Sequence, residues 1–148
     1  MIAVSDLRER WAARVEVGAA DECWPWAGYL SAEGYGRLGF QGRDLLAHRI
    51  AYELYIGSIP TGLTIDHLCR NRKCVNPAHL EAVTRGENVL RGDSRVARQA
   101  RQTECARGHA FDESNTFVGR DGRRRCRTCR REYTRVYYPE YRRRRRAR

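Results

Sequence analysis

A stretch in the middle of the chain most restricts how it can fold. Leu63 to His67 is a short run of β-formers, residues 68 to 78 are polar and basic, and Leu80 to Val83 is a second apolar run. Thr84 follows as a helix cap, with Glu87 three residues later at the capping-box position. The sequence therefore predicts a strand, a loop, a second strand and a helix in close succession.

The same stretch gathers side chains that suit phosphodiester hydrolysis. An acid adjoins a histidine, and two asparagines follow in the loop and on the helix: Asp66, His67, Asn76 and Asn88. Oxygen ligands suit a hard divalent cation, and a neutral imidazole can take a proton from water near pH 7. Any one of these residues alone would more often be structural, as a cap or a packed side chain. Together, at this spacing, they predict a catalytic site.

Residues 63–92 resemble the HNH, or ββα-metal, nuclease motif. Residues 22–92 as a whole resemble the HNH endonucleases of bacteriophage genomes and mobile introns, the homing type. Asp66 and His67 match the first H of the motif, and Asn76 matches the central N. Asn88 stands at the final H position, where asparagine is a known substitution in this family. The resemblance implies an α+β fold, with a small ββα-metal nuclease core after an N-terminal hairpin-helix region.

Roles for these residues follow from the resemblance and from chemistry. We expect Asp66 and Asn88 to offer oxygen ligands to one catalytic Mg²⁺ or Mn²⁺ ion. We expect His67 to act as the general base that deprotonates the attacking water. Asn76 is expected to brace the loop through hydrogen bonds to the backbone without touching substrate. The family reaction leaves a 5′-phosphate and a 3′-hydroxyl.

Cations beside these residues indicate phosphate contacts. Three lie in the loop between the strands, where we expect them to clamp the scissile strand, the alternative being a solvated loop face: Arg70, Arg72 and Lys73. Arg49 is a further candidate for a phosphate contact, whereas we expect the neighbouring His48 to be packed or hydrogen-bonded.

The C-terminal part contains a second constellation, Cys105-x3-His109-x16-Cys126-x2-Cys129. Four soft ligands at this spacing are typical of a structural tetrahedral zinc site. The few apolar residues nearby could not stabilise so small a fold without a metal. Unrelated free thiols are the alternative, and a disulfide is less expected in a reducing cytosol. The sequence therefore predicts a zinc-stabilised, ribbon-like module over residues 103–131.

A second zinc site is predicted inside the catalytic loop. Cys69-x4-Cys74-x4-His79 supplies three ligands, and Cys23 is the remaining cysteine. A Cys3His site of this kind would pin the N-terminal region to the loop. The alternatives are buried cysteines without a metal, or His79 acting as an extra ligand of the catalytic ion.

The domain organisation that we predict has four parts. Residues 1–95 form the nuclease domain, 96–102 a helical or flexible linker, 103–131 the zinc module and 132–148 an arginine-rich tail. Within the first part the patterns predict a helix, a hairpin and a second helix, at residues 5–15, 35–47 and 47–55.

Positive charge is concentrated at the C-terminal end. Residues 120–148 carry 14 of the 29 Lys and Arg residues and 3 of the 18 acids, so they supply the whole net charge of +11. Such asymmetry is typical of polyanion binding, the alternative being a solubilising tail. In the zinc module we expect DNA contacts from Arg123, Arg124, Arg125, Arg127, Arg130 and Arg131. Tyrosines interleave with the tail arginines, which would grip duplex backbone or stack on exposed bases.

These features predict a metal-dependent, phage-type DNA endonuclease that uses Mg²⁺ or Mn²⁺ for catalysis and two structural zinc ions. No apolar stretch approaches the ~20 residues of a membrane helix and no secretory signal is evident, so we expect a cytoplasmic protein of the bacterial host cell. Double-strand cleavage would need a homodimer or sequential nicks. The rival hypotheses are a non-catalytic zinc DNA-binding protein and a protein directed at RNA.

Overall fold

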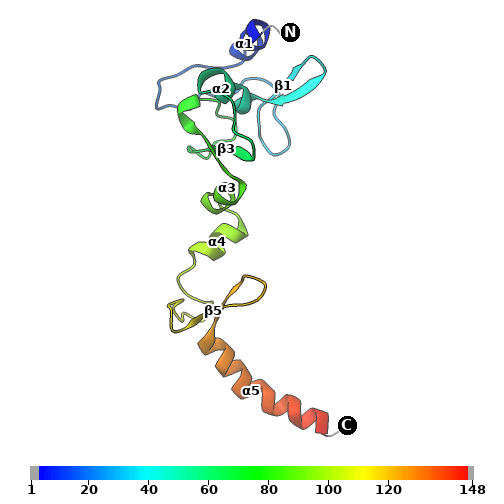
Figure 1. The fold of residues 1–148 in the computed structure, drawn as a ribbon, viewed down its shortest axis with the longest axis vertical. Helices are drawn as coiled ribbons and strands as arrows, with labels where there is room; N and C mark the ends of the chain where they lie inside the picture. The colour runs from blue at the N-terminus through cyan, green and yellow to red at the C-terminus, as the bar shows by residue number, and fades with distance from the viewer. Residues whose placement is uncertain (1–3, 147–148) are drawn as a thin grey trace. The chain divides into compact units, whose positions relative to one another are not determined.

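The structure is a computed structural model that describes residues 4–146. The chain separates into two compact units, Met1–Ser94 (unit 1) and Arg95–Arg148 (unit 2). Both combine helices with small antiparallel sheets of two strands, so the predicted α+β class is confirmed (Figure 1). Within the described residues, no helix is both long enough and apolar enough to span a bilayer.

Unit 1 begins with α1 (Val4–Ala12). The sequence predicted that this helix continues to Val15, but it stops three residues earlier. Val15 instead forms an antiparallel bridge with Trp26, after a turn in which the Val15 N–H donates to the Ala12 carbonyl. The competing backbone pairing therefore ends the helix, which is a tertiary effect that local periodicity does not record.

The predicted hairpin consists of β1 (Arg37–Phe40) and β2 (Arg43–Leu46). Its two turn residues, Gln41 and Gly42, both have positive φ values, of 48° and 72°. A tight two-residue hairpin turn requires this left-handed conformation, which glycine adopts at little cost. The chain then enters α2 (Ala47–Tyr55) directly.

The central stretch folds as predicted into two strands and a helix. Strand β3 (Leu63–His67) pairs antiparallel with β4 (Leu80–Thr84), and a 3₁₀ turn, η1 (Pro77–His79), leads into β4. Helix α3 (Arg85–Arg91) follows at once, and the Thr84 hydroxyl caps it by accepting an N–H bond from the third residue of the helix. Helix α3 packs against both strands.

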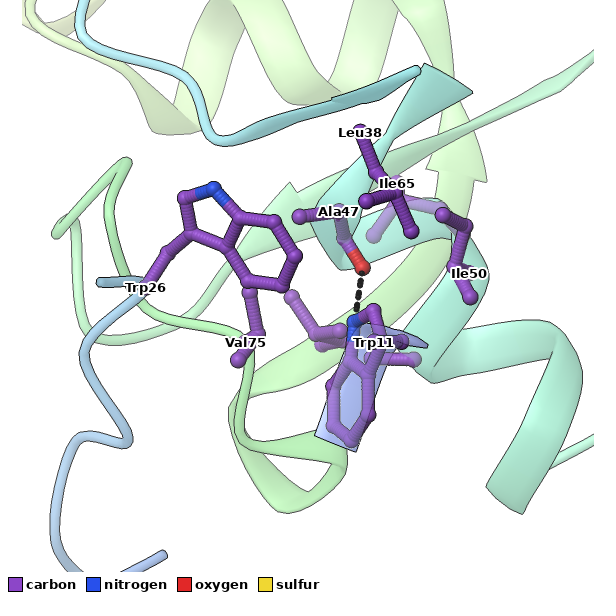
Figure 2. Packing of buried hydrophobic residues seen from close by; sticks show 9 residues of the cluster. Trp11, Trp26, Leu38, Ala47, Ile50, Ile65 and Val75 are labelled. Carbon is purple, nitrogen blue, oxygen red and sulfur yellow. Dashed lines mark hydrogen bonds between the residues drawn. The ribbon is translucent and has the colours of Figure 1, made fainter. Parts of the chain in front are cut away.

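One hydrophobic core joins these elements (Figure 2). Trp11 is 1% exposed, and its indole N–H donates to the Ala47 carbonyl at 2.9 Å. A Cβ atom at Gly36 would lie only 2.8 Å from the Trp26 ring, so this glycine allows the hairpin to approach the core closely. The core comprises Trp11, Trp26, Leu38, Ala47, Ile50, Ala51, Ile65, Val75 and Leu80. The two strands and the loop between them are therefore held by residues from the whole of unit 1.

Unit 2 contains α4 (Arg95–Arg101), the hairpin of β5 (Thr116–Val118) and β6 (Arg124–Cys126), and α5 (Arg127–Arg146). Among its described residues, the buried hydrophobic side chains are those of Ala97 and Cys126. Helix α5 continues without a break across residue 131, where the sequence analysis placed the start of the tail. Residues 147 and 148 of that predicted tail lie outside the described residues.

Helix α4 lies where the sequence predicted a linker. The Arg124 guanidinium donates to the carbonyls of Gln99, Ala100 and Gln102 at the end of this helix, and it also lies 5.1 Å above the Phe111 ring. These contacts join α4 to the β5–β6 hairpin, so the helix is an integral part of unit 2.

Candidate active site and metal centres

His67 lies at the end of β3 and is 6% exposed. Its Nε2 atom is 3.1 Å from the Cys74 carbonyl oxygen, which can only accept a hydrogen bond. The proton of the neutral ring is therefore on Nε2, and Nδ1 is left as a proton acceptor. Burial lowers the pKa of His67, although the Cys74 carbonyl and the Asp66 carboxylate oppose this shift. The ring is consequently uncharged at neutral pH.

Two further rings enclose this histidine. The His48 ring meets it edge-on with a centroid separation of 4.7 Å, and the Tyr35 ring lies 6.0 Å away. His48 is buried, which lowers its pKa to about 3, with the charges of His67 and Arg49 acting in the same direction. The position of His48 agrees with the packed role predicted for it, whereas no sequence pattern indicated Tyr35.

Asp66 is 3% exposed and pairs with arginines. Its Oδ1 atom accepts a bond from Arg70 at 2.8 Å, and Arg91 lies 3.6 Å from Oδ2. Oδ2 is itself buried without a hydrogen bond among the described residues. A buried carboxylate needs a cationic partner, so the donor chemistry of this site fits a divalent cation at Oδ2. No sequence pattern indicated Arg91, which also pairs with Glu81 and Glu87.

Asn88 lies on α3, the helix that packs against β3. Arg91 is three residues further along and therefore shares its helix face. Because Arg91 reaches Asp66, that face of α3 is turned toward the carboxylate. The structure thus places the two predicted magnesium ligands on facing elements.

Asn76 is buried and braces the catalytic loop. Its Nδ2 atom donates to the carbonyls of Ala20 and Glu22 at 2.9 and 2.6 Å, and its Oδ1 atom accepts from the Ala78 N–H at 2.9 Å. These bonds connect the loop to a segment more than 50 residues earlier in the chain. Asn76 therefore acts on the loop backbone.

The four residues predicted as the second zinc site come together as cluster A, which consists of Cys23, Cys69, Cys74 and His79. Their ligand atoms all lie within 4.8 Å of one another, and His79 Nδ1 is 3.7 and 3.5 Å from the sulfurs of Cys23 and Cys74. Ligands around a tetrahedral zinc ion are separated by about 3.3–3.8 Å. The Asn76 N–H also donates to the Cys74 sulfur, as it would to a thiolate. Cluster A could therefore bind zinc.

Cluster B consists of Cys105, His109, Cys126 and Cys129 in unit 2. The Cys105 and Cys129 sulfurs are 3.6 Å apart, well beyond the ~2.05 Å of a disulfide. His109 Nδ1 lies 3.5, 3.7 and 3.3 Å from the sulfurs of Cys105, Cys126 and Cys129. These separations also suit a tetrahedral zinc ion.

Asn115 organises cluster B, a role that no sequence pattern indicated. Its side chain accepts bonds from the N–H and hydroxyl of Thr128 and donates to the Ala110 carbonyl and to the Cys126 sulfur. Burial acts to raise the pKa of the Cys126 thiol, but hydrogen bonds from the Cys129 N–H and from Asn115 lower it to about 6. Cys126 is thus held as the thiolate that a metal requires, whereas burial and the neighbouring Cys105 and Cys126 raise the pKa of Cys129 to about 11.

The arginines predicted to contact DNA differ in their surroundings. Arg72 donates to the Glu33 carbonyl and lies over the Tyr35 ring, while Lys73 is exposed. In unit 2, Arg123 and Arg125 pair with Asp121, and Arg127 and Arg130 lie over the Phe117 ring. Arg124 is held by α4, and Arg131 is exposed.

Comparison with known proteins agrees with this geometry. Residues 45–90 match the family model described as HNH endonuclease, and this range includes Asp66, His67, Asn76 and Asn88. This segment is an HNH endonuclease domain. The resemblance inferred from the sequence is thereby confirmed.

Phage proteins are among the relatives of the chain. It is 37% identical over 68 residues to Protein 7.7 of Escherichia phage T7, which covers 46% of this chain and 52% of that protein. It is 34% identical over 85 residues to Protein 2.8 of the same phage, with coverages of 56% and 57%. An uncharacterized gene 5.3 protein of Enterobacteria phage T3 is 35% identical over 49 residues, with coverages of 33% and 48%. The chain spans about half the length of these curated relatives, and no solved structure matches it.

Proposed function

We propose that unit 1 is a metal-dependent endonuclease that hydrolyses phosphodiester bonds in DNA. The observation that carries this proposal is a buried His67 whose Nδ1 atom is left as a proton acceptor, next in sequence to Asp66. The buried Oδ2 atom of Asp66 accepts no hydrogen bond from the described residues, although Arg91 lies 3.6 Å away. A histidine and an aspartate with purely structural roles would not need a basic nitrogen next in sequence to a buried carboxylate oxygen that is left without a hydrogen bond. The match to the HNH endonuclease family supports the same assignment.

In this mechanism His67 removes the proton from the attacking water at Nδ1. The Cys74 carbonyl holds the opposite nitrogen, and His48 limits rotation of the ring. The lowered pKa keeps the ring able to accept a proton at pH values where a free histidine is charged. The resulting hydroxide attacks phosphorus and the bond from phosphorus to the 3′ oxygen breaks. The departing oxygen takes a proton from solvent to give the 3′-hydroxyl, and the phosphate stays on the 5′ side.

Asp66 and Asn88 are the residues that would hold a Mg²⁺ or Mn²⁺ ion. When bound, such an ion stabilises negative charge on the phosphate and on the departing oxygen. Arg70, Arg72 and Lys73 would contact phosphates of the scissile strand, and Asn76 would keep the loop in place. Clusters A and B would each bind one structural zinc ion, with cluster A bracing the loop that carries the Cys74 carbonyl.

The direct test is nicking of supercoiled plasmid by zinc-loaded protein in the presence and absence of added Mg²⁺ or Mn²⁺. We expect His67→Ala to lower the nicking rate about 10²–10⁴-fold, as removal of a general base does, while duplex affinity stays close to wild type. Asn88→Ala should weaken activation by the metal. Asn71→Ala is its control, since it removes an exposed amide from the β3–β4 loop, where that amide accepts a hydrogen bond from the Lys73 N–H.

The second candidate is a zinc protein that binds nucleic acid without cleaving it, which the exposed arginines of unit 2 would favour. Persistent absence of nicking by the wild-type chain, with either metal and on several substrates, would establish this alternative. Competition of duplex DNA with structured RNA separates a DNA-directed protein from an RNA-directed one.

A further inference from the structure

Helix α5 (Arg127–Arg146) arranges its charges by face. Four arginines follow one another at spacings of 4, 7 and 4 residues: Arg131, Arg135, Arg142 and Arg146. At 3.6 residues per turn these positions fall within a sector of about 60°, and we call them the arginine stripe. All four side chains are exposed. The stripe thus presents a single row of positive charge.

The acids of the helix do not neutralise this row. Glu140 falls on the opposite side of the helix. Glu132 lies at the edge of the stripe, but its carboxylate pairs with Arg107 at 2.8 Å. The stripe therefore faces solvent with its charge available to a polyanion.

The tyrosines of α5 are already used within the helix. Tyr133 and Tyr137 stack on each other with ring centroids 4.7 Å apart and planes 15° apart. The guanidinium of Arg142 lies 5.1 Å above the Tyr138 ring, and that of Arg145 lies 6.0 Å above the Tyr141 ring. Base stacking would require a free ring face, so these contacts favour a role in positioning arginines.

The helix that carries the stripe is attached at its start to the rest of unit 2. Cys129, in the first turn of α5, belongs to cluster B, and the Arg107–Glu132 ion pair ties the next turn to the loop that carries Cys105 and His109. The start of the helix is thus fixed relative to the rest of unit 2. Because the start of the helix is fixed, the four arginines keep a defined orientation relative to the rest of unit 2.

We propose that the arginine stripe binds the phosphate backbone of duplex DNA, as an anchoring surface independent of base sequence. It rests on the proposed function only for the choice of DNA as the polyanion. The stripe is about 22 Å long at 1.5 Å per residue, while phosphates of one strand follow at about 3.4 Å along the duplex axis. Four guanidinium groups along that length can each meet a phosphate, and such contacts give affinity without sequence information.

The test compares two double variants in the full-length, zinc-loaded chain, with His67→Ala included so that cleavage does not interfere. R135Q/R142Q removes two stripe charges, and R143Q/R144Q removes two charges from the same helix outside the stripe. Binding to a fluorescent duplex of about 20 base pairs is followed by anisotropy from 50 to 200 mM salt. Zinc content and helical circular dichroism verify that both variants are folded.

The stripe variant should bind at least 10-fold more weakly and should reduce the slope of log affinity against log salt by about 1.8, because two phosphate contacts are lost. The control should show less than half of each change. Equal losses in the two variants would show a general charge effect and overturn the stripe. A preference for single-stranded DNA that Tyr137→Leu abolishes would also overturn it, in favour of base stacking. Nicking by the wild-type chain is measured separately. A failure of the nuclease proposal would appear in that measurement and a failure of the stripe proposal in the binding measurements.

Discussion

The two units hold the same kind of Cys/His cluster in very different surroundings. Cluster A adjoins a hydrophobic core, since Cys74 is fully buried and the next residue, Val75, belongs to that core. Cluster B lies in a unit whose described residues bury only Ala97 and Cys126 among their hydrophobic side chains. A metal bound by three cysteines and one histidine could therefore reinforce a fold that already has a hydrophobic core, or supply the main stabilisation of a fold that has almost none.

This contrast indicates that the two units are stabilised by different interactions. In unit 1, burial of tryptophan and aliphatic side chains supplies the main driving force, and a metal would add to it. In unit 2, too little apolar surface is buried to offset the loss of chain entropy, so we expect a metal at cluster B to supply most of the folding free energy. All three tryptophans lie in unit 1, at positions 11, 24 and 26, so their fluorescence reports on that unit alone.

The largest effect is expected from loss of cluster B. Cys126→Ser should unfold unit 2, because structural zinc sites contribute on the order of 10–16 kcal/mol of apparent binding free energy in small zinc folds. Amide spectra should lose the dispersed signals of unit 2, and zinc content should fall by one ion per chain. Cys74→Ser is the matched change in cluster A and should leave tryptophan emission native at 25 °C. Unfolding of unit 1 by Cys74→Ser would break the comparison.

A substitution in the hydrophobic core should destabilise unit 1 and leave unit 2 folded. Trp11→Ala should destabilise unit 1 by about 3–5 kcal/mol, because it removes a fully buried indole. Urea denaturation followed by emission of the two remaining tryptophans measures this loss. Tyr29→Ala, at a side chain that is 75% exposed, should change stability by less than about 0.5 kcal/mol. A loss of the dispersed amide signals of unit 2 in Trp11→Ala would contradict the separate stabilisation of the two units.

Acid should reveal a buried base in unit 1. The pKa of His48 falls from 6.5 to about 3 on folding, so the unfolded chain binds more protons between these values and stability decreases as the pH falls. At pH 5 unit 1 should be about 2 kcal/mol less stable than at pH 7 from this residue alone. His48→Gln cannot titrate and should remove that difference in urea midpoints. An unchanged pH dependence in the variant would exclude His48 as the cause.

The smallest expected effect concerns metal binding in unit 1. Arg70→Ala should tighten Mn²⁺ binding up to about 5-fold, because a partly exposed guanidinium no longer competes for Asp66. Titration calorimetry measures the affinity, and Arg72→Ala is the control, since its guanidinium contacts Glu33 and Tyr35. Weaker Mn²⁺ binding by Arg70→Ala would show that Arg70 supports the cation site.

The elements around the active site were predictable because their signals are local. The Thr84 cap, the β-forming runs and the Gln41-Gly42 turn are each recorded within a few residues, and the family match adds to them. The clustering of the cysteines and histidines was also predictable, since metal-ligand spacing is a sequence property. The zinc ions themselves and the catalytic roles remain predictions.

The surroundings of the catalytic residues were not predictable, because they depend on packing between distant segments. Tyr35 and His48 reach His67 through the fold of the hairpin and α2 against the core. Arg91 reaches Asp66 through the packing of α3. In unit 2 the change of composition near residue 131 suggested a boundary. The residues of α5 before Pro139 include no helix breaker, however, and the helix continues across the predicted boundary.

The bonds made by Asn76 also bear on how the HNH segment could be shortened or moved into another chain. The family match begins at residue 45, but the carbonyls that accept from the Asn76 amide belong to Ala20 and Glu22. A fragment that begins at residue 45 would keep every side chain proposed for catalysis and would still leave the buried Asn76 amide without its acceptors. A version of the site that can be moved into another chain therefore has to include the segment that carries Ala20 and Glu22 as well as the matched motif.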